Sequence, residues 1–244
     1  MKNELSVILI AHDEQENIDS MLEGLLSNYS NEILEIIVVD DASTDKTASV
    51  TESWQKRNSK IKLIRRTPPC GVGRALKTGF SHVSADAKYL LTMDSDFTAN
   101  IGQVRLLIQA MDKNLCDGVI GSRFIPGSSL LNYPFPKKLM NRLFHILVRT
   151  IFHIKQHDLT NNFKLYKTDI IRKIPWRSND FALNAETGIL PILAGYHIEE
   201  IPAAWAGRNH SMGKSKFGLF RFGGSYIRVI FYAWLFLLQK RKPS

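Results

Sequence analysis

Short apolar segments alternate with segments of helical periodicity along the first half of the chain. The apolar segments are rich in β-branched residues and comprise Leu5–Ala11, Ile33–Val39, Ile61–Ile64, Tyr89–Met93 and Gly118–Ile120. Apolar residues recur at helical spacing in Ile18–Leu26, Asp45–Gln55, Gly73–Ser84 and Ile101–Met111. The alternation predicts βαβ units, and therefore an α/β fold with a mainly parallel sheet flanked by helices.

Capping residues predict where two of these helices begin. Ser43, Thr44 and Asp45 can cap a helix that starts near Lys46. In the same way, Asn100 can cap the helix from Ile101.

The chain changes character beyond Pro126, where loop-like stretches surround a basic amphipathic segment, Lys137–Ile154. Strand, helix and strand patterns follow at Phe163–Tyr166, Ala185–Leu193 and His197–Ile201.

The C-terminal segment is strongly apolar and ends in basic residues. Its uninterrupted apolar run, Val229–Leu238, covers about half of a ~30 Å hydrocarbon core at a helical rise of about 1.5 Å per residue. We therefore expect an amphipathic helix that lies on a membrane surface rather than one that spans it. The alternative is a helix packed on the core or in a dimer interface.

The net charge of +9 indicates an acidic partner such as a phosphorylated substrate, an anionic membrane surface or nucleic acid. Nucleic acid is the weakest of the three, because the basic residues form no recognised recognition motif. The two cysteines, Cys70 and Cys116, have no metal-ligand spacing and fit a reducing compartment. The short run Leu5–Ala11 is followed by acidic residues, so it reads as a strand rather than a signal peptide.

Polar residues follow four of the predicted strands. They are His12-Asp13-Glu14, Asp40-Asp41, Asp94-Ser95-Asp96 and Gly121-Ser122-Arg123. Because the carboxyl ends of parallel strands meet at one edge of an open sheet, we expect these residues to line one crevice. Two carboxylates at i and i+2 can share a hard cation and present it to a diphosphate, although an Asx-type turn is the plainer explanation.

Gly71-Val72-Gly73-Arg74 matches neither a P-loop nor a dinucleotide-binding fingerprint. As a loop that opens a helix it can admit a phosphate or sugar close to the backbone. A purely structural use of the two glycines fits equally well.

The ordered set of motifs resembles family 2 glycosyltransferases of the polyprenyl-phosphate type, which include the dolichol-phosphate mannose synthases. The matching stretches are Val7–Asn17, Ile36–Thr47, Gly71–Gly79, Leu91–Asp96, Gly121–Phe124, Asp158–Tyr166, Glu186, Gly195–Trp205 and Arg208–Lys216. The resemblance implies a GT-A fold, a nucleoside-diphosphate sugar donor (GDP-mannose or a UDP-sugar), Mg²⁺ or Mn²⁺, and a polyprenyl phosphate acceptor. It also implies a peripheral or monotopic protein on the cytoplasmic face of a membrane. On this basis we expect a glycosyltransferase domain at 1–216, with a nucleotide-binding half at 1–125 and an acceptor half at 126–216, and a membrane-associating segment at 217–244.

The resemblance also assigns roles to individual residues. Nucleotide-sugar contacts are implied for Ile10, His12, Glu14, Val38 or Val39, Asp40, Asp94, Ser95, Arg208 and either Lys214 or Lys216. The implied metal ligand is Asp96, with Asp94 beside it, and the implied acceptor-phosphate residues are Arg123, Lys137 and Asn141. Asp94, Asp96 and Arg123 would carry the catalysis.

This chain departs from the usual family pattern at several places. Ile10–Glu14 replaces the common Pro-x-Tyr-Asn-Glu, Thr98 stands where the family often has Gln, and Asn161-Asn162-Phe163 replaces Ser-Gly-Phe. The spacing from Arg208 to Gly213 is longer than usual. Changes of this kind alter donor choice more readily than they abolish a reaction.

An acceptor phosphate is already an anion, so its attack on the sugar needs no strong base, and direct displacement inverts the anomeric centre. A family 2 transferase that glycosylates a carbohydrate hydroxyl is an alternative, and its base would be Glu186. A non-catalytic sugar-nucleotide-binding module at a membrane is a second alternative, although Asp94 and Asp96 are both intact.

Overall fold

The computed structural model describes residues 1–206 and 219–240, excepting the side chains of residues 98, 99, 206 and 219–222. Within these ranges a seven-stranded sheet has the order β3-β2-β1-β4-β7-β5-β8. Its strands are β1 (Leu5–Ala11), β2 (Ile33–Asp40), β3 (Ile61–Arg65), β4 (Tyr89–Asp94), β5 (Gly118–Ser122), β7 (Lys164–Lys167) and β8 (Ile198–Pro202). All run parallel except β7, which lies antiparallel between β4 and β5. The prediction of a mainly parallel α/β sheet is confirmed.

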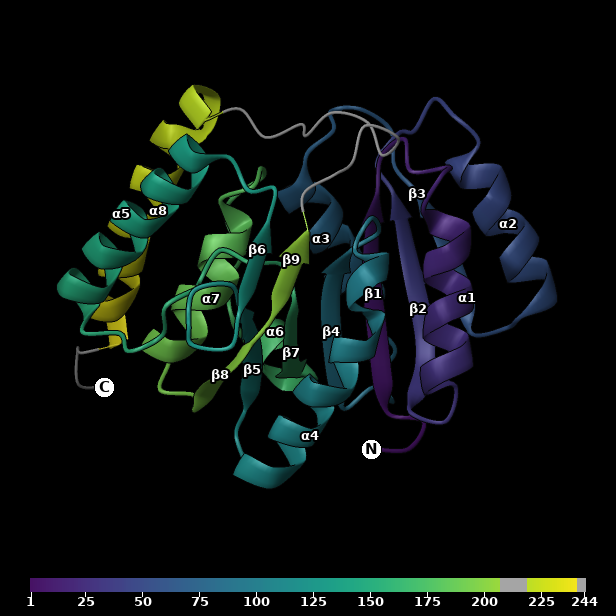
Figure 1. Cartoon of the computed structure of the whole chain (residues 1–244), viewed down its shortest axis with the longest axis horizontal. Coiled ribbons are helices and arrows are strands. Elements are labelled where there is room, and N and C mark those ends of the chain that lie inside the picture. Colours follow the sequence, from purple (N-terminus) through teal and green to yellow (C-terminus); the bar gives the residue numbers. More distant parts are fainter. Residues whose placement is uncertain (207–218, 241–244) are drawn as a thin grey trace.

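Helices cover both faces of this sheet (Figure 1). One face packs against α1 (Ile18–Tyr29), α2 (Thr47–Arg57) and α4 (Val104–Asn114), with the 3₁₀ helix η1 (Thr98–Gln103) leading into α4. The other face packs against α3 (Val72–His82), α5 (Phe135–Phe152), α6 (Thr168–Lys173), α7 (Leu183–Leu193) and α8 (Leu219–Lys240). Alternate residues of β1 enter the two cores, as the two-residue period of a strand requires.

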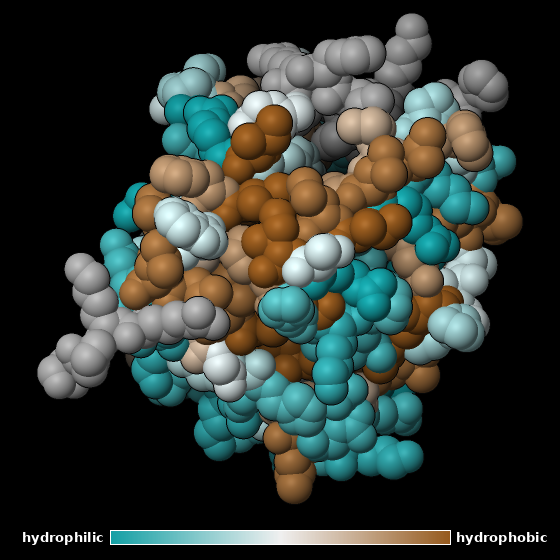
Figure 2. All heavy atoms as spheres, turned by 90° about the vertical axis from the view of Figure 1, so that its left-hand side faces the viewer, coloured by the Kyte–Doolittle hydropathy of each residue, from teal (hydrophilic) through white to brown (hydrophobic). Residues whose placement is uncertain are grey.

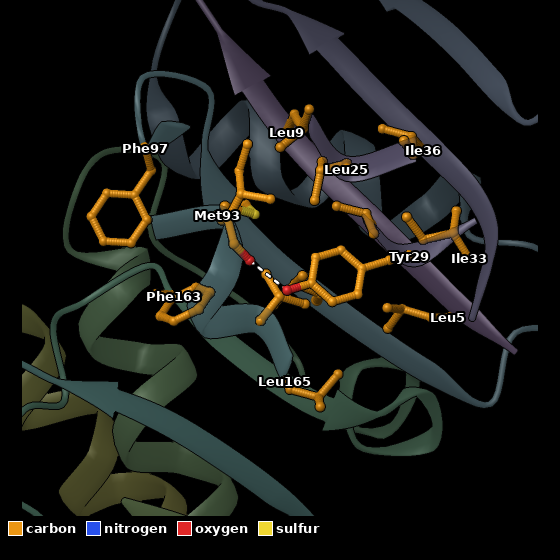
Figure 3. Packing of buried hydrophobic residues seen from close by; sticks show 14 of the residues in the cluster. Leu5, Leu9, Leu25, Tyr29, Ile33, Ile36, Met93, Phe97, Phe163 and Leu165 are labelled. Atoms are coloured by element: carbon orange, nitrogen blue, oxygen red, sulfur yellow. Dashed lines mark hydrogen bonds between the residues drawn. The ribbon is translucent and has the colours of Figure 1, made fainter. Parts of the chain in front are cut away.

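The first core consists of buried hydrophobic residues packed around the central strands (Figure 3). Its polar atom is the hydroxyl of Tyr29, a residue 2% exposed, which donates to the carbonyl of Ile101 at 2.7 Å. Phe97, directly after the predicted Asp94–Asp96 motif, packs on Phe163 with ring centroids 5.5 Å apart. The motif is therefore anchored by an aromatic pair at the edge of the core.

The sheet register brings the polar strand ends together. Ala11 lies opposite Asp40, and Ile10 lies opposite Asp94. Since β5 runs parallel to these strands, Ser122 ends at the same edge of the sheet. A small parallel sheet of β6 (Ser129–Leu131) and β9 (Ala204–Ala206) lies beyond the end of β5.

The sheet also crosses the predicted boundary between residues 125 and 126. Strand β8 pairs with β5, and β7 inserts between β4 and β5. Both halves of the chain thus contribute to one continuous hydrogen-bonded layer.

Two predicted helix starts have different outcomes. Helix α2 begins at Thr47 and its N-cap residue is Lys46, which makes no side-chain capping bond; Asp45, one position earlier, accepts from the Thr47 amide at 2.9 Å. The prediction for Asn100 is wrong, because Asn100 lies inside η1 and α4 begins only at Val104. Its side-chain amide donates instead to the carbonyl of Ala204, a contact from a distant strand that overrides the local capping preference.

Helices α5 and α8 lie side by side at one end of the molecule (Figure 1). One side of α8 enters the second core through Val229, Ala233 and Phe236. The opposite side exposes large apolar residues, so α8 is both packed on the core and amphipathic. No helix in the described ranges is long and apolar enough to cross a membrane.

Candidate active site

The loops after β1 and β2 are tied to each other by hydrogen bonds. The Asp13 amide donates to Ser43 Oγ at 3.0 Å, and the Thr44 amide donates to Asp13 Oδ1 at 2.8 Å. Asp40, which is 1% exposed, closes its own loop by accepting from the Ser43 amide at 3.0 Å. These bonds fix the outline of the crevice at this edge.

Glu14 and Val38 are both buried. Glu14 is buried, its carboxylate accepts from Asn17 Nδ2 at 2.8 Å, and its carbonyl accepts from the first amide of α1. Val38 is 0% exposed, and its backbone is paired with Leu9 on one side and Leu63 on the other. The structure thus places Val38 inside the sheet, and the predicted nucleotide contact by Val38 or Val39 stays a prediction. Val39 is equally buried.

The Asp94-Ser95-Asp96 motif follows β4 at the centre of the edge. Ser95 is 1% exposed and donates its hydroxyl to the carbonyl of Ile10 at 2.8 Å, which fixes the motif to β1. Asp94 is exposed, and its Oδ1 accepts from Asn162 Nδ2 at 2.8 Å. Ser95 therefore shapes the turn, while Asp94 is exposed and Asp96 is half-buried, and both act on the charge of Lys137. Asn162 had no role in the sequence analysis beyond its departure from the family pattern.

Arg123, at the end of β5, is held by a buried carboxylate. Its Nε and Nη2 donate to the two oxygens of Asp158 at 2.7 and 2.8 Å, and Nη2 also donates to Thr160 Oγ1 at 3.0 Å. The Arg123 amide donates to Asp158 as well, at 2.9 Å. Nη1 takes no part in these bonds.

The pKa values of this pair diverge. Burial alone would raise the pKa of Asp158, but the charge and hydrogen bonds of Arg123 outweigh it and lower the pKa to about 2. Burial would likewise lower the pKa of Arg123, but Asp158 outweighs it and raises the pKa. Both groups are therefore ionised throughout the physiological range.

Lys137 is affected by the charges of Arg123 and of the two aspartates. Its pKa is lowered to about 8 by burial and by the charge of Arg123, while Asp94 and Asp96 act in the opposite direction. Its ammonium group lies 5.2 Å from the ring centroid of Tyr133 and 5.7 Å from that of Trp205. Lys137 thus links the cationic and anionic parts of the crevice.

Asn141, one helical turn beyond Lys137 on α5, completes the cationic side. Its Nδ2 donates to Tyr133 Oη at 3.2 Å, and its Oδ1 accepts from Thr160 Oγ1 at 3.2 Å. Thr160 therefore bridges Asn141 and Arg123. The structure brings together all three residues predicted to bind an acceptor phosphate.

Asp158, Thr160, Tyr133 and Trp205 were not assigned a role from the sequence. Asp158 and Trp205 lie within stretches that match the family, which was the available signal. Thr160 lies in the same stretch as Asp158, whereas Tyr133 had no signal, because it reaches Arg123 only through the tertiary fold. Arg208, Lys214 and Lys216 lie outside the described residues, as does the side chain of Thr98.

Asp94 and Asp96 are ligands of the right type for a divalent cation, but two carboxylates alone do not complete its coordination. Asp94 and Asp96 supply hard oxygen ligands of the type that Mg²⁺ and Mn²⁺ prefer. Among the described residues, no group of three His, Cys, Asp or Glu side chains forms a metal site. The two aspartates fit a cation whose remaining ligands come from a diphosphate or water.

Glu186, the alternative catalytic base, and Gly71, in the loop predicted to admit a phosphate or sugar, both have structural roles. Glu186 is 1% exposed and its carboxylate accepts from the amides of Arg177 and Ser178, each at 2.8 Å, and from the Ser178 hydroxyl. It anchors a loop and is poorly placed as a base. A Cβ on Gly71 would lie 2.5 Å from the Asn179 carbonyl oxygen, so this glycine permits contact with that loop.

The chain matches the sequence model of glycosyl transferase family 2 over residues 6–175. It is 24% identical to a polyprenol monophosphomannose synthase of Mycolicibacterium smegmatis over 91% of this chain and 82% of that protein. An undecaprenyl-phosphate mannosyltransferase of Micrococcus luteus is 26% identical over 75% of each chain. A dolichol-phosphate mannosyltransferase of Pyrococcus furiosus is 38% identical over 57% of this chain, but only 38% of that longer protein.

A glucosyl-3-phosphoglycerate synthase of Mycobacterium tuberculosis, crystallised with Mn²⁺, UDP and phosphoglyceric acid, shares the fold. The TM-score is 0.70 at 18% identity, covering 98% of this chain and 79% of that one. The match supports the predicted GT-A architecture.

Proposed function

Because the chain belongs to glycosyl transferase family 2, it is a glycosyltransferase, and we propose that it transfers a sugar from a nucleoside-diphosphate sugar to a polyprenyl phosphate. Three relatives are named as enzymes that mannosylate polyprenyl-type phosphates, which supports a lipid phosphate acceptor and a mannose donor. A UDP-sugar is the alternative donor.

The observation that carries this proposal is that Lys137 lies close enough to both charged clusters for their charges to act on it. Arg123 lowers the pKa of Lys137, and Asp94 and Asp96 act in the opposite direction. A phosphate monoester that approaches Arg123 and Lys137 is thereby brought towards a donor held at the aspartates. The crevice can then hold two anionic groups close together, as transfer to a phosphate requires.

The bond changes need no proton transfer. An acceptor phosphate oxygen attacks the anomeric carbon as the bond from that carbon to the diphosphate oxygen breaks, and the nucleoside diphosphate leaves with the electron pair. Attack from the side opposite the leaving group inverts the configuration. Arg123, Lys137 and Asn141 orient the phosphate, and Asp94 and Asp96 would hold the cation that stabilises charge on the departing diphosphate.

A continuous apolar surface supports a lipid acceptor rather than a soluble one. Figure 2 shows hydrophobic side chains gathered over the end of the molecule formed by α5 and α8. This α5–α8 apolar face comprises Phe135, Leu139, Met140, Leu143, Ile146, Leu147, Ile151, Ile227, Phe231, Trp234 and Leu238, each at least 40% exposed. Exposed Lys138 and Arg142 lie beside it on α5 and would attract anionic lipid headgroups. We propose that this face lies on the membrane from which the acceptor is taken.

The reaction is tested by incubating the purified protein with Mn²⁺ or Mg²⁺, GDP-mannose or UDP-sugars, and a polyprenyl phosphate in vesicles. The expected product is a sugar phosphodiester that is labile to mild acid and of inverted configuration. Phosphoglyceric acid, which is bound in the crystal structure of the neighbour, serves as the comparison substrate. Exclusive use of a soluble phosphate would refute the lipid acceptor, and transfer to a sugar hydroxyl would refute phosphate transfer altogether.

Membrane docking has its own test in vesicle co-sedimentation. The double change Ile146→Glu and Phe231→Glu places charge on the α5–α8 apolar face and should abolish binding to anionic vesicles. Leu115→Glu is the matched control, since Leu115 is 86% exposed but lies at the end of α4. Equal vesicle binding by all three proteins would contradict the proposed orientation.

A further inference from the structure

Residues 157–160, which carry the Asp158 partner of Arg123, form no strand or helix. Side chains hold their backbone instead. The Glu200 carboxylate accepts from the amides of His157 at 2.8 Å and Asp158 at 2.7 Å. Lys164 Nζ donates to the carbonyl of Leu159 at 3.0 Å. The position of Asp158 therefore depends on a few side chains rather than on a regular hydrogen-bonded ladder.

His145 supplies the third of these supports and comes from α5. Its Nε2 lies 2.8 Å from the Leu159 amide, which donates to it. Its Nδ1 lies 2.7 Å from the carbonyl of Asn141. An amide can donate only to an unprotonated ring nitrogen, and a carbonyl can only accept, so the proton must sit on Nδ1. Two backbone groups thus fix one neutral tautomer.

The same helix face carries the predicted phosphate-binding residues of α5. Lys137, Asn141 and His145 follow one another at a spacing of four residues, so they lie along one stripe of the helix. His145 is 3% exposed beneath this stripe, and its Nε2 lies 3.8 Å from Asp158 Oδ1. With the bond from Thr160 to Asn141, it directly connects the helix that presents Lys137 to the segment that holds Arg123.

We infer that His145 is a positioning residue that fixes the separation between Lys137 and Arg123, the two cations proposed to bind the acceptor phosphate. The inference rests on the proposed function. It extends that function by making the acceptor site, and not the donor site, depend on a buried imidazole that never touches either substrate. Loss of the His145 to Leu159 bond would let α5 shift relative to residues 157–160 and would spread the two cations apart.

Two amide substitutions separate the two bonds of the ring. In His145→Gln the side-chain oxygen can reach the position of Nε2 and keep the bond to Leu159. In His145→Asn the shorter amide occupies the position of Nδ1 and loses that bond. We expect His145→Asn to raise the KM for polyprenyl phosphate by about tenfold or more, with the donor KM within about twofold of the unaltered protein. His145→Gln should recover most of the acceptor affinity.

Tyr29→Phe is the control for a merely structural effect. Tyr29, the last residue of α1, also joins two elements by hydrogen bonds, to Ile101 and from Arg105, but it lies in the first core. The Tyr29→Phe change should lower the melting temperature of the protein without a selective change in the acceptor KM. If His145→Asn and Tyr29→Phe change the two KM values alike, His145 is only a packing residue and the inference is overturned.

A spectroscopic measurement tests the geometry without any turnover. Long-range ¹H–¹⁵N correlation on the histidine-labelled protein should show a neutral Nδ1–H ring for His145. The signal of this ring is assigned by its absence from the spectrum of His145→Gln. An Nε2–H tautomer would overturn the inference. Absence of turnover on every phosphate acceptor by the unaltered protein would refute the proposed function, and this role with it. An unchanged acceptor KM in an active His145→Asn protein would refute the role of His145 alone.

Discussion

The anionic and cationic sides of the crevice are built in different ways. On the anionic side, Asp94 and Asp96 follow directly after one strand, and the motif is fixed by Ser95 to the neighbouring strand β1. On the cationic side, Arg123 follows a strand but depends on Asp158, which is 0% exposed and distant in the sequence. The carboxylates face the crevice, whereas the guanidinium is buried and already paired.

The difference predicts which side also supports the fold. Removing a carboxylate that faces solvent leaves no uncompensated charge, whereas removing one partner of a buried pair does. Changes on the anionic side should therefore affect activity alone. Changes on the cationic side should affect both activity and stability.

Asp158→Ala is expected to give the largest effect. It leaves Arg123 buried without its carboxylate and should destabilise the protein by about 3–5 kcal/mol. The free energy of unfolding in urea measures this, with Asp112→Ala, an exposed aspartate on α4, as the control. A loss as small as that of the control would mean that the Arg123–Asp158 pair contributes little to the fold.

Asp96→Ala should have the opposite profile. We expect turnover to fall by about 10²- to 10³-fold, because charge on the departing diphosphate loses its stabilisation, while the unfolding free energy stays within about 0.5 kcal/mol. Steady-state kinetics with added Mn²⁺ measure turnover, and unfolding in urea measures stability. Calorimetric titration of the metal with nucleoside diphosphate measures binding of the cation. Turnover unchanged in metal-depleted buffer would remove the cation from the mechanism.

The pH dependence of the unfolding free energy should reflect the protonation of His145. Burial lowers its pKa to about 4, so the unfolded chain takes up the proton first as the pH falls from about 6.5. The neutral ring stabilises the fold fully above that pH, and about 3 kcal/mol is lost progressively down to pH 4. Unfolding free energies of the unaltered protein minus His145→Gln, measured from pH 4 to 7, should show this slope.

The charged groups facing His145 have pKa values that lie below pH 4 or at about pH 7 and above. The pKa of Asp158 is lowered to about 2 by Arg123, against the effect of burial, and that of Arg123 is raised. Burial lowers the pKa of Lys164 to about 7, so its contribution changes above neutral pH. A flat difference between pH 4 and 7 would show that the ring is readily protonated in the folded protein.

Arg123→Lys tests the geometry of the cationic side while keeping its charge. An ammonium group cannot make the paired bonds to Asp158 and still face a phosphate, so acceptor kcat/KM should fall by about 10- to 100-fold. Donor KM should change little. A fall shared equally by both substrates would place Arg123 outside the acceptor site.

Asn162→Gly should give the smallest change, since it removes one neutral donor from an exposed carboxylate. Losing the bond to Asp94 should raise the donor KM by about two- to fivefold and leave acceptor KM unchanged. Asn161→Gly is the neighbouring control, because Asn161 Nδ2 donates to the carbonyl of Gly121 instead. A greater effect on the acceptor would place Asn162 on the cationic side.

The sequence by itself determined the parallel sheet and the edge where its polar residues gather. Apolar runs specify strands, and parallel strands necessarily end together, so Asp40, Asp94 and Arg123 could be assigned to one crevice from local pattern alone. The ordered motifs also predicted glycosyltransferase family 2, and the family match confirms it.

Tertiary structure decided how that crevice is supported and which residues it excludes. Val38 is enclosed by strands on both sides, and the side chain of Asn100 donates a hydrogen bond to Ala204 instead of capping a helix. Asp158 meets Arg123 only because Glu200, Lys164 and His145 converge on residues 157–160 from three separate elements. Hydrogen bonds between groups so far apart in the chain leave no periodic trace in it, because each depends on how the elements pack and not on the residues beside it.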